Sequence, residues 1–242
     1  MAAQRAPEAV VALDVASTAD ALALVDRLGP ACRFYKVGLE LFTAAGPAVV
    51  EALRARDLDV FLDLKLHDIP NTVAGAARSA ARLGVRLLTV HASGGEAMVR
   101  AAVDAFGERE TGGVLAVTVL TSLDALAVAA AWGRSTVDVG AEVVRLAGVA
   151  AAAGAHGVVC SGQEAAALRD RHGGVLATLV PGVRLAGDGA GDQRRVVTPA
   201  QAAAAGAQYV VLGRTVTAAA DPRAALRRAA DELVPAGGAA SV

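Results

Sequence analysis

Short apolar runs alternate with longer amphipathic segments along almost the whole chain. The runs are rich in Val, Leu, Ile and Phe, and they recur at intervals of roughly 25 to 30 residues. Because each run is almost continuously apolar, it is typical of a strand buried on both faces of a parallel sheet. We expect strands at 10–15, 33–38, 59–66, 86–92, 113–121, 156–161, 176–182 and 208–214.

The segments between these runs are rich in alanine and have the periodicity of helices. The clearest examples cover 19–28, 71–83, 136–153 and 221–233. Glycine follows several of the segments, as is common where a helix ends in a left-handed residue. The expected C-terminal glycines are Gly29, Gly84, Gly154, Gly173 and Gly206.

Eight strand–helix units predict an α/β protein. Two architectures fit the alternation, an open doubly wound sheet and a closed (β/α)8 TIM barrel. Eight units in 242 residues match the usual size of the barrel, and no GxGxxG sequence follows the first strand. We therefore expect a single barrel domain over 9–234, with flexible ends at 1–8 and 235–242.

Charge and composition narrow the classes of partner. The net charge is −1, so no overall field favours nucleic acid or an acidic membrane. No apolar run reaches the ~18 residues of a membrane span, and the first residues lack a secretory pattern. Cys32 and Cys160 lie in apolar settings and are expected to be buried thiols of a reducing compartment. We expect a cytoplasmic protein with no nucleic-acid or membrane partner.

Polar residues gather where the predicted strands end. In (β/α)8 barrels these carboxyl ends carry the chemistry. A single polar residue at a strand end is usually a cap or a solvated group, but here seven of the eight predicted strands contain at least one near their end, and Arg184 follows the remaining strand. The residues are Asp14, Lys36, Asp63, Lys65, His91, Ser93, Thr121, Ser122, Ser161, Arg184 and Arg214.

The two lysines of the chain both lie at this rim. Among 23 basic residues only Lys36 and Lys65 are lysines. Asp63 and Lys65 share one face of their strand, since side chains two residues apart point the same way. With Asp14 and Lys36 they could form an alternating charged array, either as a structural ion-pair network or as a site of proton transfer. A lysine ammonium can deliver a proton that a guanidinium holds, which favours proton transfer.

Asp68 lies in the turn after the third strand, just before Pro70. It could cap the following helix, with Pro70 in its first turn. Its side chain could instead reach the barrel mouth of a neighbouring subunit.

The ends of strands seven and eight are suited to phosphate. They carry Pro181, Arg184, Gly213 and Arg214, with arginines for bidentate contacts and a glycine for close backbone approach. The glycine-rich loop 185–195 has the composition of a mobile lid or of plain disorder, and Gln193 on it could reach the phosphate on closure.

These residues resemble the orotidine 5'-phosphate decarboxylase family over about residues 9 to 234. The resemblance rests on the following stretches: ALDV, KVGLELF, DLKLHDIPNTV (63–73), VHASGG, VLTS, VPGVR, GDQRR and VLGR. The DxKxxD pattern is shared with relatives that act on sugar phosphates, whereas HDIPNT together with PGxR and GDQ is more specific.

The resemblance implies the conversion of orotidine 5'-monophosphate to UMP and CO2 without metal or organic cofactor. Lys65 would protonate C6 of the pyrimidine, and Asp63 would lie against the substrate carboxylate. Asp14 and Lys36 would bind the ribose hydroxyls, with Lys36 also part of the charged array. The resemblance also implies a homodimer in which Asp68 and Thr72, with Ile69 between them, reach the partner's site. The remaining substrate contacts would come from Thr121, Ser122, Pro181, Arg184, Gln193, Gly213 and Arg214.

Two other functions remain open at this point. A relative with the same DxKxxD pattern could use Mg²⁺ for decarboxylation of a sugar phosphate or for an aldol reaction, although Lys36 is a poor neighbour for a divalent cation. The chain could also be a phosphate-binding barrel without catalysis. Its four histidines have no metal-ligand spacing, and His91 is expected to be a hydrogen-bonded core group.

Overall fold

The computed structural model describes residues 6–108, 111–187 and 195–234, and they form a closed barrel of eight parallel strands in chain order. This confirms the predicted (β/α)8 architecture. Each predicted strand is present, with ends within a few residues of those expected. The strands are β1 (Glu8–Ala12), β2 (Phe34–Gly38), β3 (Asp59–Leu66), β4 (Leu87–His91), β5 (Gly113–Val117), β6 (Gly157–Val159), β7 (Ala177–Val183) and β8 (Tyr209–Leu212).

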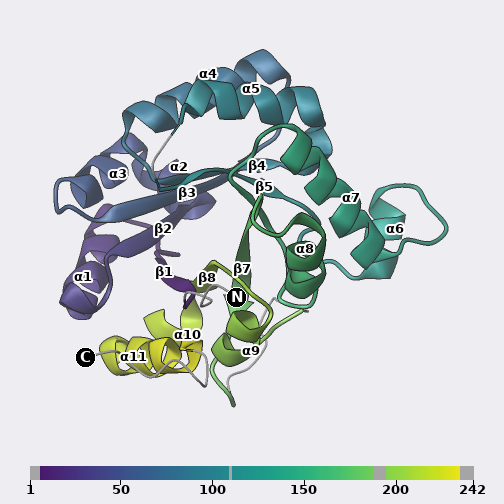
Figure 1. Cartoon of the computed structure of the whole chain (residues 1–242). Helices are drawn as coiled ribbons and strands as arrows, with labels where there is room; N and C mark the ends of the chain where they lie inside the picture. Colours follow the sequence, from purple (N-terminus) through teal and green to yellow (C-terminus); the bar gives the residue numbers. More distant parts are fainter. Residues whose placement is uncertain (1–5, 109–110, 188–194, 235–242) are drawn as a thin grey trace.

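Helices surround the barrel, as Figure 1 shows, with α4 and α5 side by side and α6 projecting outwards. The α-helices are α1 (Thr18–Leu28), α2 (Leu39–Ala45), α3 (Pro47–Arg54), α4 (Pro70–Arg82), α5 (Glu96–Phe106), α6 (Ala125–Ala131), α7 (Val139–Ala152), α8 (Ala165–His172), α9 (Pro199–Ala204), α10 (Arg214–Thr217) and α11 (Pro222–Leu233). Short 3₁₀ turns lie at Gly29–Ala31 and Ala92–Gly94.

Apolar side chains form two separate cores because alternate residues of each strand point to opposite faces. The larger core lies between strands and helices and includes Leu62 and Leu88. The smaller core fills the lumen, with Phe61 and Leu87 from the same strands. Leu64 and Leu66 pack against the outer core, as the alternation of β3 predicts.

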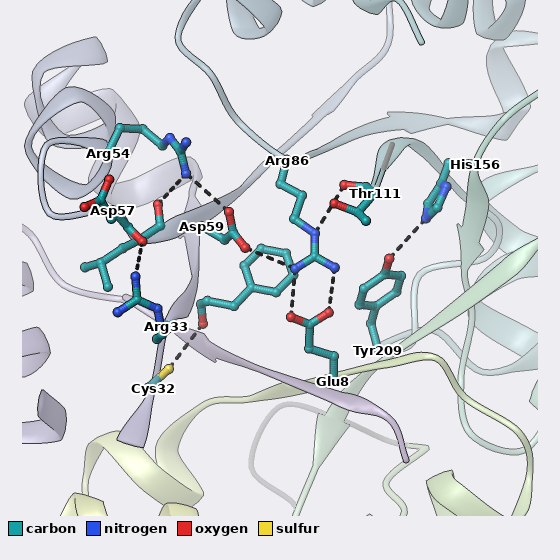
Figure 2. Close-up of polar contacts among 12 residues, drawn as sticks. Glu8, Cys32, Arg33, Arg54, Asp57, Asp59, Arg86, Thr111, His156 and Tyr209 are labelled. Atoms are coloured by element: carbon teal, nitrogen blue, oxygen red, sulfur yellow. Dashed lines mark hydrogen bonds and ion pairs between the residues drawn. The ribbon is translucent and has the colours of Figure 1, made fainter. Parts of the chain in front are cut away.

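The amino-terminal end of the lumen is closed by one arginine and its partners. The Arg86 guanidinium donates to both carboxylate oxygens of Glu8, at 2.7 and 2.6 Å, and to Asp59 at 3.1 Å (Figure 2). It also lies over the ring of Phe34, with 4.6 Å from its central carbon to the ring centroid. Burial acts to lower the pKa of Arg86, but the hydrogen bonds to Glu8 and the electrostatic attraction of Glu8, Tyr209 and Asp59 together outweigh it, and the net shift is upward. We call Glu8, Asp59 and Arg86 the basal ion cluster.

At the ends of the chain and of the helices, some details agree with the expectations and others differ. The first strand begins at Glu8, inside the segment expected to be a flexible end, whereas 1–5 and 235–242 lie outside the described residues. Gly29, Gly84, Gly154 and Gly206 have the expected positive φ. Gly173 ends α8 with φ −50°, and the left-handed residue is its neighbour Gly174.

Both cysteines are buried free thiols, as predicted. Burial raises the pKa of Cys32 and of Cys160, because a thiolate is poorly solvated in either place. Among the described residues, no helix has the length and apolar character needed to cross a membrane.

Candidate active site

A pocket of about 500 Å³ opens at the carboxyl ends of the strands. Its floor is the top layer of the lumen core, including Phe61, Val159 and Leu179. Its wall contains most of the polar residues expected at the rim. They are Asp14, Lys36, Asp63, Lys65, Thr121, Ser122, Arg184 and Arg214, with Pro181, Gly182 and Gly213 beside them.

Four of these residues form an alternating charged array across neighbouring strands. Lys65 Nζ lies 2.8 Å from each carboxylate oxygen of Asp63. Lys36 Nζ lies 2.8 Å from Asp14 Oδ1 and 3.9 Å from Asp63 Oδ2. The side chains of Lys36 and Asp63 are each 12% exposed, whereas Asp14 is 60% exposed. Asp63 is therefore a buried carboxylate between two ammonium groups. The attraction between these opposite charges offsets the free-energy cost of removing the three groups from water.

Gly38 makes room for this array, a role that no pattern in the sequence indicates. A Cβ at this position would lie 2.8 Å from Lys36 Nζ and 3.5 Å from Asp14 Oδ1. Gly38 is the last residue of β2 and has φ −93°, which any residue can adopt. A glycine suits this position because the Lys36 ammonium lies where a Cβ would come too close. This proximity is visible only in the three-dimensional structure.

The part of the pocket wall that follows β7 and β8 carries the groups predicted to hold phosphate. Arg184 is largely buried, 9% exposed, and follows β7. Its Nη1 would lie 3.8 Å from a Cβ at Gly213, so the arginine passes close to the glycine backbone. Arg214 is exposed at the rim and begins α10. Gln193 and most of the predicted lid lie outside the described residues.

Thr121 and Ser122, expected to contact the pyrimidine, also line the pocket. Thr121 is buried and Ser122 is exposed. Both follow β5, in a turn ahead of α6.

The exposed residues of the segment Asp68–Thr72 do not line the pocket of their own chain. Asp68, Ile69 and Thr72 are exposed, with Ile69 at 66%, and none of the three lines the cavity. The cap of α4 is Ile69, with Pro70 at the first helical position, so the alternative of Asp68 as a helix cap is wrong. Asp68 instead accepts a 2.6 Å hydrogen bond from the Ile69 amide.

His91 lies beside the array, not in the pocket wall. Its ring contacts that of His67, with centroids 5.4 Å apart. Burial lowers the pKa of His91, and the neighbouring His67 and Lys65 lower it further. In the described ranges, no three His, Cys, Asp or Glu side chains gather as a metal-binding group.

The family model and the similar proteins point to the same family. The sequence model described as "Orotidine 5'-phosphate decarboxylase / HUMPS family" matches residues 7–229. The chain is 52% identical to an orotidine 5'-phosphate decarboxylase of Halorhodospira halophila over 238 residues, covering 96% of this chain and 98% of the relative. It is 51% identical to one of Moorella thermoacetica over 230 residues, covering 93% and 91%.

The fold agrees with solved structures of proteins with the same name. The crystal structure of orotidine 5'-phosphate decarboxylase from Lactobacillus acidophilus superposes with a TM-score of 0.83. It is 35% identical in sequence, and the match covers 95% of this chain and 99% of that one.

Proposed function

The chain belongs to the orotidine 5'-phosphate decarboxylase / HUMPS family, and from this premise we propose that its charged array is the machinery that decarboxylates orotidine 5'-monophosphate to UMP. The activity follows from relatives about 50% identical over most of their length that carry the decarboxylase name. The chain is therefore a carboxy-lyase of pyrimidine biosynthesis. The observation that carries the assignment to these residues is the pairing of Lys65 with a buried carboxylate inside the pocket.

Lys65 is the proton donor in this proposal. Loss of CO2 leaves a carbanion at C6 of the pyrimidine, and a fixed ammonium stabilises that charge and then protonates the carbon. Support comes from the two 2.8 Å contacts that fix Lys65 Nζ against Asp63. Asp63 would also lie against the substrate carboxylate. The step is balanced, because the electron pair of the broken bond between C6 and the carboxylate remains on C6 and accepts the proton from Lys65 as CO2 leaves.

The remaining groups bind the parts of the substrate that do not react. Asp14 and Lys36 would hold the ribose hydroxyls, and Thr121 with Ser122 the pyrimidine edge. Arg184, Arg214 and the backbone at Pro181 and Gly213 would hold the phosphate, together with Gln193. Arg184 and Arg214 line the pocket after β7 and β8, and β7 lies four strands from β3 in the closed barrel, which supports this orientation. Binding energy from a distant phosphate can then contribute to the chemical step.

A homodimer in the cytoplasm completes the proposal. Asp68, Ile69 and Thr72 are exposed beside the mouth of the barrel, at the start of α4, which is where a second subunit could take them up. Asp68 would join the partner's array next to Lys65, and Thr72 and Ile69 would contact the partner's substrate. The two buried free thiols fit a reducing compartment.

The donor set favours this reaction over the magnesium-dependent alternative. Asp14 and Asp63, the carboxylates of the described pocket, each lie 2.8 Å from a lysine ammonium. A divalent cation would have to displace those ammonium groups, and Glu40 is exposed outside the pocket. We therefore propose that the reaction needs no metal.

The test is the loss of orotidine 5'-monophosphate absorbance with purified protein in excess EDTA. Rapid conversion to UMP is expected. No conversion, together with activity on a sugar phosphate that Mg²⁺ restores, would assign the chain to the metal-dependent relatives and overturn the proposal.

A further inference from the structure

β3 does not run regularly into the active site. Its Leu62 pairs with Leu88 of β4, but the next pair along is Leu66 with Val90. Four residues of β3 therefore span the distance that two residues of β4 cover, which makes a bulge over Asp63–Lys65. Within it Lys65 has φ 51°, a left-handed conformation that is unusual for a residue with a side chain.

One hydroxyl of β4 lies at the centre of this bulge. Thr89 is fully buried, and its strand neighbours Leu88 and Val90 are the residues on either side of the slip. Thr89 Oγ1 accepts a 2.9 Å hydrogen bond from the Lys65 amide and donates a 2.9 Å hydrogen bond to Asp63 Oδ1. A hydroxyl has one proton and two lone pairs, so both bonds form together.

We propose that Thr89 is the positioning residue of the proton donor, an inference that rests on the proposed function. The hydroxyl holds the Lys65 backbone in its left-handed conformation by giving its amide a partner that the displaced ladder cannot supply. The same hydroxyl fixes the Asp63 carboxylate, whose two oxygens hold Lys65 Nζ. Thr89 therefore fixes Lys65 at both its backbone and its ammonium.

Thr89 acts on the chemical step more than on substrate binding. It does not line the pocket, and its described hydrogen bonds go to Asp63 and Lys65 and not to the groups proposed to hold ribose or phosphate. Without the hydroxyl, the bulge can relax and the carboxylate can rotate. A displacement of a reacting group by about 1 Å can lower the rate ~100-fold.

The experiment compares Thr89→Val, which keeps the side-chain shape and removes both hydrogen bonds, with Thr89→Ser, which keeps the hydroxyl. Thr178→Val is the matched control, because Thr178 is also buried and hydrogen-bonded but lies near the amino-terminal end of β7. All variants and the native protein are assayed for kcat and KM with orotidine 5'-monophosphate.

We expect Thr89→Val to lose about 100-fold in kcat with KM changed less than about threefold. Thr89→Ser should keep most of kcat, and Thr178→Val should lose thermal stability while kcat stays native. A Thr89→Val enzyme with native kcat would overturn the proposal, as would an equal loss in the Thr178→Val control.

The experiment still tests the inference when Thr89→Val does not fold, and it separates failure of the inference from failure of the proposed function. If Thr89→Val does not fold, Thr89→Cys replaces it, since a thiol is a weak hydrogen-bonding group; Ser and Cys variants of equal kcat would then overturn the proposal. A native protein that does not turn over the substrate would overturn the proposed function and this inference together. An active native protein with an unaffected Thr89→Val variant would overturn only the inference.

Discussion

At the residue scale, we expect the chemistry to depend on Lys65 and an arginine there not to replace it. In the Lys65→Arg variant the charge would remain beside Asp63, but the guanidinium would not release its proton. We expect the variant to fold and to lose at least ~100-fold in kcat, the lower range of a general acid's contribution. Circular dichroism and turnover measurements would check this, and near-native turnover would exclude Lys65 as the proton donor.

Gly38 tests whether the position of the other lysine matters. The Cβ of Gly38→Ala would meet Lys36 Nζ at 2.8 Å, and a flexible side-chain end can move away at little cost. We expect native stability and a loss of roughly tenfold or more in kcat/KM, because the ammonium leaves Asp14. Steady-state kinetics and thermal unfolding measure the two effects.

The control for Gly38→Ala is Gly148→Ala in α7, where an added Cβ meets nothing within 4 Å. That change should leave kcat/KM unchanged and raise helix stability slightly. A Gly38→Ala enzyme as active as the control would show that the ammonium can move without effect.

The sequence predicted the charged residues of the site but not those that position them. Two lysines in an arginine-rich chain, each at a strand end, pointed to Lys36 and Lys65 directly. Gly38 and Thr89 gave no comparable signal, because the role of each depends on where the atoms of other residues lie, namely Lys36 Nζ for Gly38 and the Lys65 amide and Asp63 Oδ1 for Thr89. Thr89 could have been noticed as the polar residue between Leu87 and His91 on the inward face of β4, but its two bonds arise from the bulge in β3.

At the element scale, the carboxyl ends and the amino ends of the strands have different roles. The carboxyl ends carry the pocket, and the basal ion cluster joins the start of β1, the start of β3 and the residue before β4. Alternation along the third strand predicted that Asp63 and Lys65 share one face, and the polar residues at the strand ends predicted the rim. The basal ion cluster was not predicted, because its three members are separated by many residues and become neighbours only when the sheet closes.

Arg86→Met should therefore lower stability and leave catalysis intact. The variant removes the bonds to Glu8 and Asp59, both of which are about 40% exposed and can be resolvated. We expect the free energy of unfolding to fall by about 2 kcal/mol, a value that allows for solvent screening of the partners. Urea unfolding and kcat measure the two quantities.

Arg100→Met is the comparison for Arg86→Met. Arg100 pairs with Glu96 on the surface of α5, with both side chains about half exposed, and also donates an exposed hydrogen bond to the Ala152 carbonyl. These exposed contacts should together contribute ~1 kcal/mol or less. Equal losses in the free energy of unfolding for the two variants would show that the basal ion cluster stabilises the fold no more than an exposed surface ion pair does.

At the scale of the whole molecule, the single barrel was predictable because eight buried strands at regular spacing allow few other arrangements. Assembly is a different matter. The turn Asp68–Thr72 follows Lys65 by only a few residues, yet its exposed residues do not line the pocket of their own chain. We propose that a second copy of the chain receives this turn in a dimer.

Subunit exchange tests that proposal. Lys65→Ala and Asp68→Ala proteins should each be nearly inactive alone, because each removes a group from every site. A mixed dimer would contain one site with native Lys65 and native Asp68. Random reassortment of two equal populations should recover about a quarter of the native sites, since about half of the dimers are mixed.

Recovered activity on mixing is the expected measurement, with each variant incubated alone as the control. Mass spectrometry of differently labelled subunits would establish that exchange occurred. Exchange without recovered activity would show that Asp68 does not act in the partner's site.

The two buried thiols make this chain convenient to label. Reagents such as maleimides react with thiolates, and burial keeps Cys32 and Cys160 protonated and out of contact with solvent. A cysteine introduced at Ala186, which is exposed two residues after Arg184, would be the reactive thiol without any native cysteine being replaced. A fluorophore attached there would report substrate arrival at the rim of the pocket in real time.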